Sequence, residues 1–148
     1  MGYKGYKGKF IPKNPKKYKG DSNNIIYRSS WEYAAFSYLD NNPDILYWSS
    51  EEVIIPYYSE IDNKNHRYFV DLYYKNSKGE EWLIEIKPQS QTIPPKPKRN
   101  KKKLLEEVLT YEKNKAKWIA ANSFCKTRGW NFSVWTEVTL KNIGLKIL

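Results

Sequence analysis

The sequence predicts a single domain of mixed α/β class, from its length, its apolar content and the order of its periodic segments. Its 148 residues are about one domain long, and 40% of them are apolar, including six Trp, thirteen Tyr and five Phe. A chain of this size and composition is able to bury a single core. A helical pattern comes first along the chain, several strand patterns follow, and a second helix and a last strand complete the order.

The N-terminal segment, residues 1–24, is expected to form a basic arm, flexible or extended, ahead of a domain at residues 25–148. Gly, Lys, Tyr, Pro and Asn dominate the arm, which lacks helical and strand periodicity. Its tyrosines either stack on nucleic-acid bases or pack on the domain, and the sequence leaves both readings open. The first helix is expected to start at Ser29, because Ser29 and Glu32 have the spacing of a capping box, and Asn41-Asn42-Pro43 stops it.

Short apolar runs at residues 45–48 and 53–58 then predict strands, followed by a polar loop over residues 59–65. After a central hairpin and a proline-rich segment, a second helix is expected over about residues 101–126, closed by Gly129. A last strand over about residues 132–136 and a short tail complete the chain. The residues expected to define the inner face of the second helix are Leu104, Leu105, Val108, Tyr111, Lys115, Trp118 and Ile119.

The central hairpin joins residues 67–74 to residues 81–87, both rich in aromatic and β-branched side chains. If its loop is Ser77-Lys78-Gly79, the register places Asp71 opposite Glu85. Directly opposed side chains point to the same side, with Cβ atoms about 4.5–5.5 Å apart. A two-residue loop would spoil this alignment.

Two facing carboxylates repel each other unless a cation lies between them, and Mg²⁺ prefers one or two carboxylates together with water and substrate phosphate. Lys87 lies on the same face as Glu85, where its ammonium can stabilise negative charge that develops on a phosphate. The strand pattern therefore indicates a site for metal-assisted phosphodiester hydrolysis at Asp71, Glu85 and Lys87.

Simpler interpretations compete with this one. Glu-x-Lys is a common triplet on solvated strand faces, although here Glu85 interrupts an almost continuous apolar run. The similar triplet Asp62-Asn63-Lys64 lies in a polar loop without rigid support. Glu32 is explained locally as a helix cap. His66 is the only histidine, so it forms neither a metal cluster nor a catalytic triad, and it is read as a loop or DNA-contact residue.

The net charge of +10 favours an anionic polymer as partner, either nucleic acid or an acidic membrane surface. Seven lysines and no acid in residues 1–20, and five more lysines with Arg99 in residues 96–103, favour nucleic acid. No apolar run is long enough for a membrane span. The lone Cys125 excludes a Cys-based zinc site and an internal disulfide. The residues expected to contact DNA are Lys4, Lys7, Lys9, Lys16, Lys17, Lys96, Lys98, Arg99, Lys101, Lys102 and Lys103.

The segments Phe69-Val70-Asp71 and Ile84-Glu85-Ile86-Lys87, 14 residues apart between the acids, resemble the PD-(D/E)xK nuclease core, with Val70 in the place of its proline. Together with Tyr27-Arg28-Ser29-Ser30-Trp31-Glu32, Trp48-Ser49-Ser50-Glu51-Glu52 and Ile55-Pro56-Tyr57, they are similar to the TnsA-like endonucleases, and among these to the head completion nucleases of T-even-like tailed phages. The similarity covers nearly the whole chain.

This resemblance implies a restriction-endonuclease-like fold, a central mixed sheet flanked by helices. It implies that Glu32, Asp71, Glu85 and the main-chain carbonyl of Ile86 hold Mg²⁺, for which Mn²⁺ would substitute, and that Lys87 is the catalytic lysine. The further candidates for DNA or phosphate contact are Gln89, Gln91, Asn114 and Lys117.

The expected function is that of an endonuclease that hydrolyses double-stranded DNA, acting on packaged phage DNA during head completion. Capsid or portal proteins are the implied partners. The implied place is the host cytoplasm during assembly, with association with the virion. Two alternatives stay open: a DNA-binding structural protein of the capsid or portal that retains the fold without cutting, and a basic RNA- or ribosome-binding module.

Overall fold

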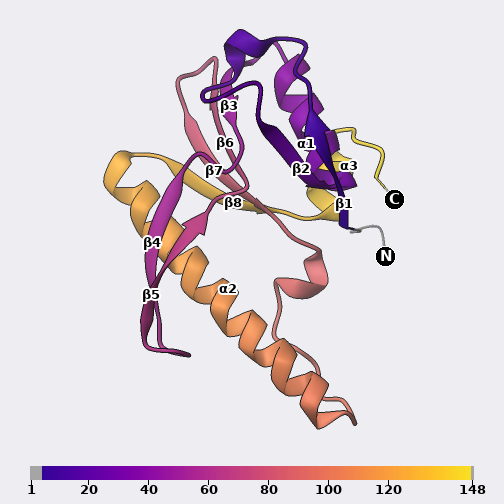
Figure 1. The fold of residues 1–148 in the computed structure, drawn as a ribbon, viewed down its shortest axis with the longest axis vertical. Coiled ribbons are helices and arrows are strands. Elements are labelled where there is room, and N and C mark those ends of the chain that lie inside the picture. The colour runs from indigo at the N-terminus through magenta and orange to yellow at the C-terminus, as the bar shows by residue number, and fades with distance from the viewer. Residues whose placement is uncertain (1–4, 148) are drawn as a thin grey trace.

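The computed structural model describes residues 5–147, with side chains from residue 7 onward, and confirms the mixed α/β class (Figure 1). Strands β3, β6, β7 and β8 form the central sheet in the order β3-β6-β7-β8, in which β7 and β8 are parallel and the other pairs antiparallel. Two separate hairpin-like pairs, β1 with β2 and β4 with β5, flank it. The elements are β1 (Gly5–Phe10), the 3₁₀ turn η1 (Pro15–Lys17), β2 (Ile25–Ser29), α1 (Ser30–Asn41), β3 (Ile45–Ser49), β4 (Ile54–Ser59), β5 (Lys64–Phe69), β6 (Leu72–Asn76), β7 (Glu81–Ile86), the 3₁₀ turn η2 (Gln89–Gln91), α2 (Lys101–Arg128), β8 (Asn131–Trp135) and α3 (Glu137–Asn142).

The central sheet separates two apolar clusters, because successive strand residues point to opposite faces. Ile84 and Ile86 of β7 pack with Phe36 of α1 on one face. Leu83 packs on the other face with Ala121 of α2 and with side chains of the β4–β5 pair. The expected sheet flanked by helices is therefore confirmed, with α1 and α3 on one side and α2 on the other (Figure 1).

Residues 5–24 are packed onto the domain. Strand β1 is extended and pairs with β2, and the side chains of Phe10 and Tyr18 belong to the same apolar cluster as α1. The Lys17 ammonium donates to the main-chain carbonyls of Leu39, Asp40 and Asn42 at 2.9–3.1 Å, where α1 ends. The N-terminal segment thus contributes to the core and caps a helix, while residues 1–4 lie outside the described residues.

The expected single strand over residues 67–74 is wrong, because the chain changes partners at Val70. Up to Phe69 it forms β5, which pairs with β4, and from Leu72 it forms β6, which pairs with β3 and β7. Val70 bridges the two parts: its N–H donates to the carbonyl of Val53, and its carbonyl accepts from Glu51. Tyr68 and Val70 pack on the same face of the sheet as Leu83, whereas Leu72 packs on the opposite face, so the alternation of side chains reverses at this crossing.

Helix α2 begins at Lys101, where the Asn100 side chain accepts from the Lys103 N–H, and ends at Gly129 in the left-handed conformation (φ 71°). Its predicted inner face is wrong in part. Leu105, Val108 and Ile119 are exposed, and the buried residues are Asn114, Ala121 and Cys125. The N-terminal half of α2 extends beyond the sheet (Figure 1), so Leu105 and Val108 have no sheet face to cover.

The tail expected after β8 contains a further helix, α3, which Thr136 caps and whose Leu140 is fully buried. The first helix follows the prediction, since α1 starts directly after its N-cap Ser29. None of the helices in residues 5–147 is both long and apolar enough to cross a membrane.

Candidate active site

The register of the β6–β7 hairpin matches the prediction. Tyr74 lies opposite Trp82 and Leu72 opposite Ile84, and the turn closes through a hydrogen bond from the Asn76 N–H to the Glu80 carbonyl. Gly79 adopts φ 81°, which the turn requires and glycine allows. The same register, continued by one residue, places Asp71 opposite Glu85.

Asp71 precedes β6 by one residue, at the point where the chain enters the central sheet. Its Oδ2 accepts a hydrogen bond of 2.8 Å from the Ile86 N–H, which fixes the carboxylate against the end of β7. Burial raises the pKa of Asp71 well above its usual range, and the charges of Glu85 and Glu32 raise it further. Both effects disfavour the ionised carboxylate when no cation is present.

Glu85 is almost fully buried, with 4% of its surface exposed. Its Oε1 accepts a hydrogen bond of 2.6 Å from the Tyr68 hydroxyl, and its Oε2 lies 3.8 Å from the Lys87 ammonium. Burial raises the pKa of Glu85, against the opposing effects of Tyr68, Lys87 and Lys117. Sequence reasoning did not single out Tyr68, because simple alternation along residues 67–74 assigns it to the face opposite Asp71.

Glu32 lies in the first turn of α1, and its main chain and side chain both make structural hydrogen bonds. Its N–H donates to Ser29 Oγ at 3.1 Å, and its Oε1 accepts from the Arg28 N–H at 2.7 Å. Burial raises the pKa of Glu32, and the charges of Glu51 and Glu85 also raise it. Ser29 is therefore the cap of the helix, while the Glu32 carboxylate holds the Arg28 main chain and its charge acts on Asp71.

The acidic side chains do not make a complete metal-binding set by themselves. Within residues 5–147, no three Asp, Glu, His or Cys side chains are grouped closely enough to hold an ion. A cation at Asp71 and Glu85 would need main-chain or solvent oxygens as well. That is the pattern of Mg²⁺, which usually binds through one or two carboxylates and keeps several waters.

Lys117 approaches the same carboxylates from α2. Its ammonium lies 5.4 Å from the centre of the Tyr68 ring, whose hydroxyl holds Glu85. Burial lowers the pKa of Lys117, while the negative charge of Glu85 opposes this shift. Lys87 and Lys117 thus bring two ammonium groups to the acid pair from different elements.

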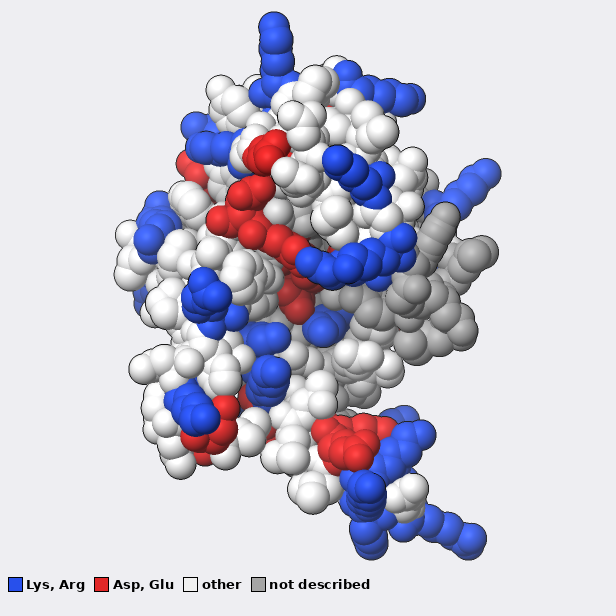
Figure 2. Space-filling model, in the orientation of Figure 1, with Lys and Arg blue, Asp and Glu red and all other residues white. Residues whose placement is uncertain are grey.

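A second ion pair, between Arg28 and Glu51, lies near Glu32 and Asp71. The Arg28 guanidinium donates from Nε and Nη2 to the two carboxylate oxygens of Glu51, at 2.9 and 3.1 Å. Glu51 has a backbone φ of 57°, which is uncommon for a residue other than glycine. Figure 2 shows acidic side chains forming a band that leads into the middle of this face, with Lys and Arg side chains around it.

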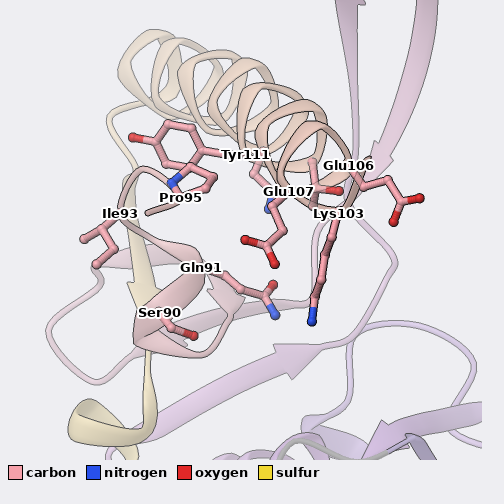
Figure 3. A pocket seen from close by; sticks show the side chains of 10 residues that line it. Ser90, Gln91, Ile93, Pro95, Lys103, Glu106, Glu107 and Tyr111 are labelled. Carbon is pink, nitrogen blue, oxygen red and sulfur yellow. The ribbon is translucent and has the colours of Figure 1, made fainter. Parts of the chain in front are cut away.

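A cavity of about 510 Å³ lies between the segment after β7 and the N-terminal half of α2, and neither Asp71 nor Glu85 lines it. Lys103 and Gln91 point into it (Figure 3). Asn114 lines it and is 3% exposed, and its Nδ2 is buried without a hydrogen-bond partner. The remaining lining residues are Ser90, Ile93, Pro95, Glu106, Glu107, Thr110 and Tyr111.

The lysines expected to contact DNA have different environments. Lys98 forms an ion pair with Glu107, and Lys17 caps α1, so both have partners within the protein. Lys4 lies outside the described residues. Two groups are exposed, one near β1 and η1 and one at the start of α2: Lys7, Lys9 and Lys16, and Lys96, Arg99, Lys101, Lys102 and Lys103.

Comparison with known proteins identifies the class that this fold and site define. The sequence profile of the TnsA-like endonuclease N-terminal domain matches residues 42–137, which include Asp71, Glu85 and Lys87. The chain belongs to the TnsA-like endonuclease family, and it is a DNA endonuclease, as the sequence predicted. Among individual relatives, it is 44% identical over 146 residues to the head completion nuclease of Enterobacteria phage T4, a match that covers 95% of this chain and 97% of that relative.

Proposed function

We propose that the protein cuts DNA in a Mg²⁺-dependent reaction at Asp71, Glu85 and Lys87. The observation that carries the proposal is the pair of carboxylates that the β6–β7 register sets opposite each other, both with raised pKa, beside an ammonium 3.8 Å from Glu85. Two facing acids that are largely withdrawn from water repel each other and destabilise a protein unless a cation joins them. Their donor set fits Mg²⁺, with Mn²⁺ as a substitute, and the Ile86 carbonyl and Glu32 are the further candidate ligands.

Each protein group has a definite task in this proposal. The Ile86 N–H and the Tyr68 hydroxyl orient Asp71 and Glu85. Lys87 stabilises the negative charge that develops on the phosphate, and Lys117 lies near enough to Glu85 to assist. A bound Mg²⁺ would polarise the scissile phosphate and lower the pKa of a bound water.

The exposed lysines would bind the DNA backbone, with no sequence readout. Contacts of this kind release counterions, so we expect strongly salt-dependent, largely sequence-independent binding. Lys17 is a poor candidate because its ammonium already donates to three carbonyls.

The relative from phage T4 bears the name of head completion, and we propose the same process for this protein. It would then act on packaged DNA in the host cytoplasm during assembly, associated with the virion and with capsid or portal proteins. The similarity along almost the full length of both chains supports this proposal.

The test is plasmid nicking by the purified protein with Mg²⁺, with Mn²⁺, with EDTA, and by Lys87→Ala. We expect cutting with either metal, none with EDTA, and a loss of at least a hundredfold in Lys87→Ala, in line with the removal of one charge-stabilising group. Lys78→Ala, in the β6–β7 turn, serves as the control for loss of one lysine. If the wild type retards DNA but never nicks it with either metal, the proposed Mg²⁺-dependent cleavage at Asp71, Glu85 and Lys87 is refuted.

A further inference from the structure

The Arg28 side chain is partly exposed and forms an ion pair with Glu51. Half of it (51%) is exposed, and Glu51 holds the guanidinium through two parallel hydrogen bonds. The Arg28 main chain is fixed, since its N–H donates to Glu32 at the start of α1. The charges of Glu32 and Asp71 also act on the guanidinium, so it lies close to the catalytic acids.

The Glu51 side of this pair is held rigidly. The N–H of Glu51 donates to the Val70 carbonyl, and the preceding Ser50 exchanges hydrogen bonds with the buried Tyr18 hydroxyl through both its N–H and its carbonyl. The turn therefore keeps Glu51 in its left-handed conformation (φ 57°). Of the two partners, the long arginine side chain is the one that can move without disturbing the fold.

We propose that Arg28 binds a backbone phosphate of the DNA next to the cleaved bond, and that Glu51 occupies its guanidinium until DNA arrives. A carboxylate and a phosphate present the same pair of oxygens to the planar donor fork of arginine. Glu51 thus takes the place of the phosphate in the free protein. An exposed ion pair in water is weak, so a phosphate that also releases counterions can displace it.

The inference rests on the DNA endonuclease function but is tested by binding, without cleavage. Fluorescence anisotropy of a labelled 30-base-pair duplex, in EDTA, gives the dissociation constant at a series of KCl concentrations. The variants are Arg28→Ala, Arg28→Lys, Glu51→Gln and the double variant Arg28→Ala/Glu51→Gln. Matched controls are Lys78→Ala, which removes a positive charge at the far end of β7, and Glu52→Gln, which removes a negative charge from the same turn.

Arg28→Ala is expected to weaken binding about 5–10-fold at 100 mM KCl and to reduce the salt slope by about one ion. Lys78→Ala should change binding less than about twofold. Glu51→Gln frees Arg28, so it should tighten binding more than Glu52→Gln does. In the Arg28→Ala background, Glu51→Gln should have no greater effect than Glu52→Gln, because the gain depends on the arginine.

Several outcomes would overturn the proposal. One is that Arg28→Ala binds DNA like Lys78→Ala. Another is that Glu51→Gln weakens binding, as expected if the pair only supports the fold. If Arg28→Ala melts at a much lower temperature, Arg28→Lys and Glu51→Gln decide the question instead. Lysine keeps the charge but loses the two-point contact, so the DNA affinity of Arg28→Lys should lie between those of the wild type and Arg28→Ala. Absence of nicking in a protein that passes these binding tests would refute the Mg²⁺-dependent cleavage alone.

Discussion

At the scale of single residues, the acid pair is a position where the fold carries a cost in stability. Glu85 is buried and Asp71 half-buried, their negative charges repel each other, and each carboxyl has a raised pKa. Their hydrogen-bond partners, the Ile86 N–H and the Tyr68 hydroxyl, hold the carboxylates in place rather than neutralise them. Such an arrangement makes physical sense where a cation and a phosphate are to be bound.

Asp71→Asn should abolish cutting and leave the metal-free protein as stable as the wild type or more stable. The amide oxygen can still accept from the Ile86 N–H, while the repulsion from Glu85 disappears. A gain of 1 kcal/mol corresponds to a rise in melting temperature of about 2–4 °C for a chain of this size. Thermal melting in EDTA measures it, and a large fall in melting temperature would contradict the metal-site interpretation.

The raised pKa values of Asp71 and Glu85 also fix the pH dependence of stability in the metal-free protein. Because both acids bind protons more readily in the folded state, stability is greatest below their unfolded pKa. It falls as the pH rises from the ordinary carboxyl range through the raised folded values. Denaturant unfolding in EDTA between pH 4 and pH 8 measures this fall, and it should be smaller in Asp71→Asn. An identical pH profile for both proteins would refute the assignment.

At the scale of elements, the sequence predicted those boundaries and turns that are set by a residue at the boundary itself. Ser29 defined the start of α1, Gly129 the end of α2, and Gly79 the turn that sets the register of Asp71 against Glu85. The site followed from that register. The break between β5 and β6 was missed because it depends on which strand Val70 pairs with, and pairing partners far along the chain leave no local pattern.

Helix α2 illustrates the same limit, since its apolar residues misled the prediction of its inner face. Ala121 and Cys125 pack against the sheet, whereas Leu105 and Ile119 face solvent. Which helix residues are buried depends on where the sheet ends, and the sequence of the helix carries no information about that position. Lys117, one turn from Asn114, therefore reaches the acid pair from a face that hydrophobic periodicity did not mark.

Asn114→Leu should stabilise the protein, because the Asn114 Nδ2 is buried without a partner. Removing an unsatisfied buried donor recovers about 1–3 kcal/mol when the replacement fits the same volume. Urea unfolding gives the change in free energy. The matched control is Asn122→Leu, an exposed asparagine on the same helix, for which we expect a change within about 0.5 kcal/mol. Destabilisation by Asn114→Leu alone would mean that this amide has a partner in the native protein.

At the scale of the whole molecule, the N-terminal segment joins electrostatics to folding. Its composition predicted a basic arm, and the lysines at positions 7, 9 and 16 are exposed as such an arm requires. The same segment places Phe10 and Tyr18 in the core, and Tyr18 supports the turn that holds Glu51. Exposed lysines and buried aromatic residues are interspersed along this segment, so its composition alone does not show which residues belong to the core.

These two roles can be separated by mutation. Phe10→Ala should cost about 3–5 kcal/mol of stability, as for other buried phenylalanines, and removal of residues 1–20 should prevent stable folding. The triple variant Lys7→Ala/Lys9→Ala/Lys16→Ala should keep the wild-type melting temperature and weaken DNA binding, with a salt slope reduced by up to about three ions. Melting curves and anisotropy titrations measure both effects. A truncated protein that folds normally would show that the segment is only an electrostatic arm, and a triple variant that unfolds would show that its lysines are needed for the fold.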